Sequence, residues 1–181
     1  MHTTRRAALT AALFLLLAPA FAQGARKKSQ IVSIQTTKGT IKIKLFPEVT
    51  PFTVANFLKL VKKGFYNGLT FHRVEPHFVI QGGDPEGNGS GGPGWTIKNE
   101  DNKKLRHNRG AVAMANAGPD TAGSQFYIVI SDDPKKPATF LDEKDARGIS
   151  KYTIFGQVIK GQEIAEKIAK GDKMIKVSVQ P

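Results

Sequence analysis

The sequence predicts a mostly antiparallel β-barrel or β-sandwich that carries two helices. Its apolar segments are short and numerous, and glycine, proline or charged residues separate them. Only two stretches show the three-to-four-residue spacing of apolar positions that is typical of an amphipathic helix. Strand-like and helix-like segments do not alternate along the chain, which argues against a doubly wound parallel sheet. These three observations favour one domain made of many short strands.

The N-terminal residues 1–22 have the pattern of a cleaved secretory signal peptide. Two arginines precede an apolar run over residues 7–18, and residues 20–22 supply the small-x-small pattern that a signal peptidase accepts. The alternative, a membrane anchor, needs roughly 20 apolar residues, and this run is shorter. The paired arginines also leave a twin-arginine route open beside the general secretory one. We therefore expect an exported protein, in the periplasm or secreted, whose mature chain begins with a basic flexible lead over residues 23–29.

The chain is basic, with 27 Lys and Arg against 15 Asp and Glu. Without the leader, which holds two of the arginines, the net charge is +10. Such a balance would suit a nucleic acid or an anionic surface, but the lysines are scattered. Lys42 and Lys44 alternate with aliphatic residues, which places them on the solvent face of a strand. We therefore expect no nucleic acid among the partners and no membrane after the leader is removed.

The first elements of the mature chain are a predicted hairpin and a helix. The stretch IVSIQTTKGTIKIKLF, residues 31–46, contains two alternating runs that join around Gly39, which is a hairpin signal. The apolar spacing then changes to that of a helix. Thr50 can cap this helix, Pro51 suits its first position, and Gly64 stands where it should end.

Six further short strands and one more helix follow. The strands are expected over residues 71–74, 78–81, 111–115, 125–130, 153–159 and 173–179. The helix is expected over residues 161–171, where Ile164 and Ile168 lie one turn apart between two glycines. The chain has no cysteine, so hydrophobic burial rather than disulfide bonds must stabilise the fold.

Several enzyme chemistries lack their sequence signature in this chain. Gly87, Gly89 and Gly92 satisfy the dinucleotide pattern G-x-G-x-x-G. However, Pro93 follows where that pattern requires a helix to open. The histidines lack the helical spacing of a zinc pair, and no nucleophile elbow surrounds Ser124. We therefore expect neither a metal nor a cofactor.

Two stretches combine an apolar strand with glycines, alanines and a few polar side chains. They are FHRVEPHFVIQGGDPEGNGSGG, residues 71–92, and GAVAMANAGPDTAGSQFYIVI, residues 110–130. Glycine and alanine leave the backbone accessible, and polar side chains beside it can hydrogen-bond an extended chain. Such surfaces are suited to binding a peptide.

The order and intervals of these motifs resemble the cyclophilin family of peptidyl-prolyl cis-trans isomerases. The likeness rests on FHRVEPHFVIQGGD, GNGSGGPG, MANAGPDTAGSQFYI, FLD and KYTIFGQVIKG, and it covers about residues 30–180. It implies a mainly β fold, a closed eight-stranded antiparallel β-barrel capped by two α-helices, over an isomerase domain at residues 30–181. It also implies a substrate groove on the outer face of the barrel and an activity that needs no cofactor.

The resemblance implies a role for each conspicuous residue. Arg73 in the F-H-R motif matches the catalytic arginine, and Gln81 matches the amide that orients it and meets the substrate. The walls of the pocket for the substrate proline ring correspond to Phe78, Val79, Tyr127 and Leu141. The remaining substrate-binding positions correspond to Gly89 in the loop beside the adjoining pocket, Ala115, Asn116 and Gln125 along the peptide backbone, and Phe140 and Tyr152.

Three departures from the family pattern concern the rim of the groove. Phe140 stands where members sensitive to cyclosporin usually have tryptophan, which predicts weak binding of that drug. Tyr152 stands where many members have a histidine, and a tyrosine can still pack and hydrogen-bond there. The segments over residues 131–139 and 142–150 are longer than the family pattern, and we expect them to reshape one rim.

Simpler interpretations remain for some of these residues. Arg73 could be a cation on a strand surface that forms an ion pair with Glu75. Phe126 is expected in the core. Gln81 and Asn116 could merely satisfy backbone groups at strand ends. As a whole, the sequence predicts a monomeric isomerase that acts on proline-containing unfolded or nascent polypeptides during the folding of exported proteins. The alternative is a non-catalytic peptide-binding chaperone or assembly factor that uses the same groove.

Overall fold

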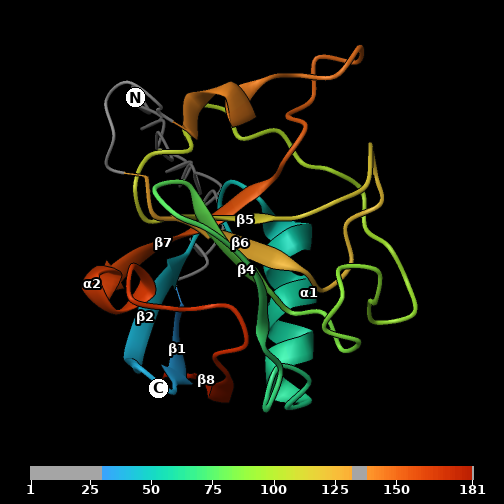
Figure 1. Cartoon of the computed structure of the whole chain (residues 1–181). Coiled ribbons are helices and arrows are strands. Elements are labelled where there is room, and N and C mark those ends of the chain that lie inside the picture. Colours follow the sequence, from blue (N-terminus) through green and yellow to red (C-terminus); the bar gives the residue numbers. More distant parts are fainter. Residues whose placement is uncertain (1–29, 132–137, 181) are drawn as a thin grey trace, which may run out of the picture.

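The computed structural model describes residues 30–131 and 138–180. The expected signal peptide over residues 1–22, the basic lead over residues 23–29 and most of the segment 131–139 lie outside the described residues. The described part is built around one curled sheet with a helix against it (Figure 1). No helix in this part is long and apolar enough to cross a membrane.

Eight strands, all paired antiparallel, form the sheet in the order β3-β4-β6-β5-β7-β2-β1-β8. Their bounds are β1 Ile31–Thr36, β2 Gly39–Leu45, β3 Phe71–Glu75, β4 Val79–Gly82, β5 Ala111–Met114, β6 Phe126–Val129, β7 Ile154–Lys160 and β8 Met174–Val179. The helical elements are α1 Pro51–Lys62, α2 Gln162–Ala165 and the 3-10 helix η1 Ala138–Asp142. The strands from β3 onward begin and end within one residue of the ranges that the sequence predicts.

The two edge strands approach each other, so the sheet curls into a half-barrel. Thr70 and Lys173 form an isolated bridge just before β3 and β8, and the Phe71 N–H donates to the Asp172 carbonyl at 2.9 Å. The predicted fold class, mainly β with eight antiparallel strands and two α-helices, is confirmed. The barrel is less closed than expected, because β3 and β8 themselves share no ladder.

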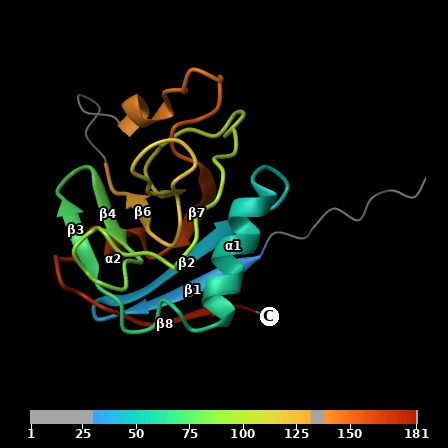
Figure 2. The ribbon, with the colours of Figure 1, turned by 90° about the vertical axis from the view of Figure 1, so that its right-hand side faces the viewer.

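Strand β1 pairs with β2 in the expected hairpin and with β8 on its other side. Gly39, after the turn, has a φ of 137°, a conformation that glycine adopts most easily. Lys42 and Lys44 lie on the outer side as predicted, with buried aliphatic residues beside them. The Gln180 N–H donates to the Ile31 carbonyl at 2.8 Å, so the start of β1 and the end of β8 are neighbours (Figure 2).

An aromatic cluster fastens α1 to the sheet. Phe57 is fully buried, and its ring centroid lies 4.8 Å from that of Phe155 and 5.6 Å from that of Phe126. Pro51 opens the helix as expected, and Gly64 follows its end with a φ of 70°. Truncating a core aromatic of this kind to alanine typically costs about 3–5 kcal/mol of stability.

The cap of α1 comes from a distant residue rather than from Thr50. The Thr50 hydroxyl donates to the Ile154 carbonyl at 3.2 Å and makes no cap hydrogen bond. Instead, the Glu100 carboxylate accepts the backbone N–H groups of Phe52 at 3.2 Å and Thr53 at 2.7 Å. A negative group at this end of a helix is favourable, because the first N–H groups have no partner inside the helix.

Helix α2 is shorter than the expected range of residues 161–171. Beyond Ala165, the N–H groups of Lys167 and Ile168 bond to carbonyls three residues back, at Ile164 and Ala165. Such bonds form a tighter turn than an α-helix. The chain thereby turns toward β8 while Ile168 stays buried.

Candidate active site

Alternate residues of the central strands serve opposite faces of the sheet. On β6, Phe126 and Ile128 enter the main core, which confirms the prediction for Phe126. Tyr127 and Val129 point the other way, into a second apolar cluster on the outer face, where Leu141 from η1 joins them. Strand periodicity therefore supplies both a stable core and an apolar base for a groove.

A pocket of about 350 Å³ opens over this second cluster. Its lining consists of Arg73, Phe78, Val79, Gln81, Ala115, Asn116, Tyr127, Phe140, Leu141 and Tyr152. An adjoining pocket of about 550 Å³ shares Gln81, Ala115 and Asn116 with it and adds Gly89 and Gln125. The structure thus brings together all the residues that the sequence predicts for the site, from three strands, η1 and the loops between them.

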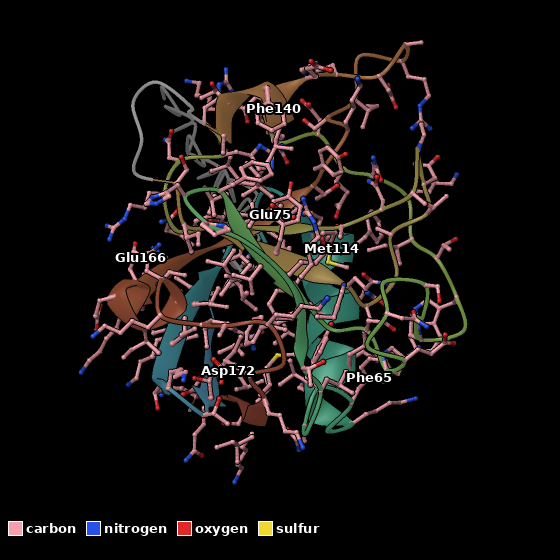
Figure 3. The ribbon with its side chains drawn as sticks, viewed as in Figure 1. Phe65, Glu75, Met114, Phe140, Glu166 and Asp172 are labelled. Atoms are coloured by element: carbon pink, nitrogen blue, oxygen red, sulfur yellow. The ribbon has the colours of Figure 1, made fainter. Side chains whose placement is uncertain are left out.

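The walls of the smaller pocket are aromatic and aliphatic. The rings of Phe78 and Phe140 stack with centroids 5.2 Å apart, and Phe140 is 59% exposed. Figure 3 shows Phe140 on η1, on the side of the molecule where β3 ends at Glu75. Tyr127 and Leu141 are buried at the bottom. A small apolar ring that enters between these side chains would be removed from contact with water.

Arg73 supplies the positive charge at the edge of this pocket. It lies opposite Gln81 in the β3–β4 ladder, and its Nη1 is 3.4 Å from Gln81 Oε1. Its Nε is also 3.5 Å from a Glu75 carboxylate oxygen, as the simpler interpretation of a surface ion pair expected. Both side chains of that pair are about half exposed, so the pair adds little to stability. The guanidinium therefore remains available to a molecule in the pocket.

A chain of amides links Arg73 to the glycine-rich loop. Gln81 Nε2 donates to Gln125 Oε1 at 2.9 Å, and Gln125 Nε2 donates to the carbonyls of Gly89 and Gly91, each at 2.9 Å. These side chains are therefore held in one orientation. Gln81 lines both pockets, so its amide lies where they adjoin.

The glycine-rich loop is organised around one buried carboxylate. Asp84 accepts the backbone N–H groups of Glu86, Asn88 and Gly89. Burial by itself would raise the pKa of Asp84, but these three N–H donors outweigh it and lower the pKa below its ordinary value. The charged form of Asp84 thus stabilises the wall of the larger pocket.

The opposite rim is formed by Asn116 and Tyr152. Asn116 Nδ2 donates to the Lys151 carbonyl at 2.7 Å, and the Ala115 N–H donates to the Gln125 carbonyl at 3.0 Å. Asn116 thus satisfies a backbone group, as the simpler interpretation expected, and also lines both pockets.

The segment over residues 142–150, expected to reshape a rim, folds back on the molecule. Arg147 forms ion pairs with Asp120 at 2.7 Å and with Asp145 at 2.6 Å, and Lys144 pairs with Asp101 at 2.8 Å. The Arg147 guanidinium lowers the pKa of Asp120 to about 2. The segment leads directly into the rim at Tyr152, and the pocket remains open beside it.

Two residues beside the pocket were missed by reasoning from the sequence. The His107 side chain is fully buried and lies behind Tyr127, with its Nε2 2.9 Å from the tyrosine hydroxyl. Its Nδ1 is 2.7 Å from Asp142 Oδ1. Asp142 ends the FLD motif but was given no role there, His107 belongs to no motif, and no spacing in the sequence indicates that they meet. Only the fold brings β6, η1 and the loop before β5 together.

Comparison with known proteins gives a consistent result. A family model described as cyclophilin type peptidyl-prolyl cis-trans isomerase/CLD matches residues 31–180. The chain is 48% identical over 141 residues to peptidyl-prolyl cis-trans isomerase B of Bacillus subtilis, with 77% of this chain and 90% of that protein covered. A peptidyl-prolyl cis-trans isomerase of Helicobacter pylori is 43% identical over 148 residues, with 80% of this chain and 83% of that protein covered.

A similar solved structure is that of a cyclophilin type peptidyl-prolyl cis-trans isomerase of Cryptosporidium parvum. It matches with a TM-score of 0.71 and 31% sequence identity, and the match covers 84% of this chain and 98% of that chain. A second crystal structure of that protein was obtained in the presence of the dipeptide Ala-Pro.

The fold and the pocket define a peptide-binding half-barrel in which the Arg73 guanidinium lies at the edge of the smaller, apolar pocket. The chain belongs to the cyclophilin-type peptidyl-prolyl cis-trans isomerase family, and it is an enzyme of that activity. The predicted family and enzyme class are thereby confirmed.

Proposed function

We propose that this isomerase accelerates slow X-Pro steps in the folding of exported proteins and that Arg73 is its catalytic residue. The observation that carries the assignment is the position of the Arg73 guanidinium, which lines the apolar pocket and lies 3.4 Å from the Gln81 amide. The Ala-Pro dipeptide used with the Cryptosporidium parvum relative supports a proline-containing ligand.

The chemistry needs neither a nucleophile nor a cofactor. Rotation about a peptide bond faces a barrier of about 18–20 kcal/mol, because the nitrogen lone pair is delocalised into the carbonyl. The cis and trans forms of an X-Pro bond are close in energy but exchange within tens to hundreds of seconds, which can limit folding. A catalyst therefore has to favour the twisted state, in which the proline nitrogen regains its lone pair.

Arg73 is suited to recognise that state. A guanidinium stays charged at all working pH values and presents its N–H donors in a rigid plane. When the proline ring occupies the pocket, a donated hydrogen bond to the proline nitrogen strengthens as the lone pair appears. Because it is stronger in the transition state than in the ground state, this interaction raises the rate rather than the affinity alone.

The remaining residues hold the substrate on both sides of the rotating bond. The walls formed by Phe78, Tyr127 and Leu141 take the proline ring. The strip at Ala115 and Asn116 offers backbone and amide groups to the preceding part of the peptide. One transition-state donor contributes about 2.7–4 kcal/mol, so ring binding and backbone fixation supply the rest of the acceleration.

The N-terminal sequence supports the exported location. An apolar run over residues 7–18 follows two arginines and precedes small residues at positions 20 and 22. Export would bring the enzyme to chains that arrive unfolded. We expect full-length protein expressed in a Gram-negative host to appear in the periplasmic fraction with Gln23 as its first residue. An uncleaved chain that stays in the cytoplasm would contradict this proposal.

The activity is tested by NMR exchange between the cis and trans isomers of a short X-Pro peptide. We expect catalytic amounts of the mature protein to accelerate exchange and the Arg73→Ala variant to lose that acceleration. Peptide binding without acceleration by the unaltered protein would instead favour the alternative, a chaperone that uses the same groove. Acceleration that survives in Arg73→Ala would remove Arg73 from its catalytic role.

A further inference from the structure

A hydrogen-bonded chain of three side chains lies behind the smaller pocket. The Tyr127 hydroxyl is 2.9 Å from His107 Nε2, and His107 Nδ1 is 2.7 Å from Asp142 Oδ1. The rings of His107 and Tyr127 stack with centroids 5.9 Å apart. The His107 side chain has no exposed surface, and it is not among the residues that line the pocket.

The direction of each hydrogen bond follows from the chemistry of the partners. An ionised carboxylate only accepts, so His107 Nδ1 carries the proton that points to Asp142. In a neutral imidazole the other nitrogen is then an acceptor, and the Tyr127 hydroxyl donates to it. Burial lowers the pKa of His107, against the opposing effect of Asp142, which favours this neutral tautomer. Burial also raises the pKa of Tyr127, so its hydroxyl keeps its proton.

The two ends of this chain belong to different walls of the pocket. Tyr127 lies on β6, and Asp142 ends η1, which carries the lining residues Phe140 and Leu141. Asp142 Oδ1 also accepts the backbone N–H of His107 at 3.0 Å. The buried His107 thus bonds to η1 through its backbone N–H and its ring, and the same ring bonds to Tyr127 of the β-sheet.

Among the residues that the structure describes, Arg106 and Tyr152 also approach the chain. Arg106 Nε lies 3.9 Å from Asp142 Oδ2, and the Tyr152 ring meets the His107 ring edge-on with centroids 6.5 Å apart. Asp142 Oδ2 is buried without a hydrogen-bond partner among the described residues. Among the described residues, the shortest contacts of the Asp142 carboxylate are therefore the two N–H groups of His107, which makes that contact hard to replace.

We propose that His107 is a positioning residue of the isomerase: by linking Tyr127 to Asp142, it sets the separation of the two pocket walls and hence the affinity for the proline ring. The inference rests on the proposed function, because it takes this pocket as the proline site. His107 touches no substrate and acts only through its two neighbours. Gln81 is the strand partner of Tyr127 on β4, and Arg73 is the partner of Gln81 on β3. Their side chains bond to each other and to Gln125, and the proposal leaves these bonds as they are.

The decisive variant is Tyr127→Phe, which removes the hydroxyl and keeps the ring. We expect KM for an X-Pro peptide to rise about three- to tenfold, the equivalent of one buried hydrogen bond, while kcat stays close to its original value. A rise in KM at constant kcat indicates the loss of binding that the ground and transition states share. Asp142→Asn, which removes the charge at the other end, should act in the same direction.

The matched control is Tyr66→Phe. Tyr66 is also a buried tyrosine, and its hydroxyl donates to the Ser124 carbonyl at 3.1 Å, away from the smaller pocket. We expect this variant to lose stability with KM unchanged. If Tyr127→Phe likewise loses stability alone, the chain is only structural and the proposal is wrong.

A spectroscopic measurement on the unaltered protein keeps the test independent of how the variants fold. The ring ¹⁵N signals of His107 should show the tautomer with a proton on Nδ1 and should shift when the X-Pro peptide saturates the site. No shift at saturation would overturn the proposal. If Arg73→Ala remains active, the assignment of the site is wrong. If Arg73→Ala loses its activity but Tyr127→Phe has an unaltered KM, the site assignment stands and only the role of His107 is refuted.

Discussion

Arg73 and Gln81 face each other across the β3–β4 ladder, with Arg73 Nη1 3.4 Å from Gln81 Oε1. The other end of the same amide donates to Gln125, so Gln81 cannot turn without breaking a second hydrogen bond. Its oxygen is therefore kept toward the arginine. The direction of the guanidinium depends on a network that reaches the glycine-rich loop.

Replacement of Arg73 should affect the reaction far more than the fold. We expect Arg73→Ala to lower kcat/KM by about two to three decades, the value of one preorganised transition-state donor. Its unfolding midpoint in urea should stay close to that of the parent, because the side chain is 44% exposed and its ion pair is at the surface. Arg73→Lys keeps the charge but loses the planar fork, and it should restore only part of the activity.

The Gln81 amide should be necessary for full activity although it is not charged. We expect Gln81→Leu, which keeps the volume and removes both hydrogen bonds, to lower kcat/KM about tenfold, the equivalent of roughly 1.4 kcal/mol. Gln125→Leu frees the loop carbonyls but leaves the Arg73 contact, so its effect should be smaller. Equal losses in the two variants would contradict the orienting role of Gln81.

The cap of α1 predicts a stability effect far from the helix in sequence. We expect Glu100→Ala to lower the free energy of unfolding by about 1 kcal/mol, since two helix N–H groups and the Thr53 hydroxyl lose their acceptor. Glu100→Gln should cost less, because an amide oxygen still accepts. Thermal denaturation measures both, and an unchanged midpoint in Glu100→Ala would show that water replaces the cap.

Stability should decrease as the pH falls below about 6.5 because of two buried histidines. Burial lowers the pKa of His107 below its ordinary value of 6.5, although the nearby Asp142 opposes this effect. Burial lowers the pKa of His72 in the same way, and there Asp84 opposes it. Between the folded pKa and 6.5 the unfolded chain binds more protons than the folded one, so unfolding becomes easier as the pH falls.

Urea denaturation at a series of pH values between about 7 and 5 measures this effect. We expect the free energy of unfolding to depend less steeply on pH in His107→Asn than in the parent protein. It should depend still less steeply on pH in a variant that also lacks His72. Stability that increases on acidification in this range would mean that both histidines are stabilised in their charged form.

The strands could be predicted from local patterns, whereas the pocket residues were predicted from the resemblance of their motifs to a known family. Alternation along β2, and the short apolar runs bounded by glycine and proline, define the strands without knowledge of their partners. The pocket residues lie in motifs whose order was recognisable. The predicted roles of these residues still await the kinetic tests above.

The parts that the sequence could not predict depend on contacts between distant residues. Glu100 caps α1 through Thr53, which lies 47 residues before it, a separation that no capping pattern covers. His107 and Asp142 are 35 residues apart and meet only because η1 folds over the outer face of the sheet. The early end of α2 likewise follows from the turn that the chain makes toward β8.

The hydrogen bond between Gln180 and Ile31 places the first and last strands of the fold edge to edge. A chain that enters at Ile31 therefore leaves close to where it entered. A short linker could join these ends, and new ends could be opened in an exposed turn, without changing any strand pair. The same geometry allows the domain to be inserted into a loop of another protein, whose two cut ends need to separate only slightly.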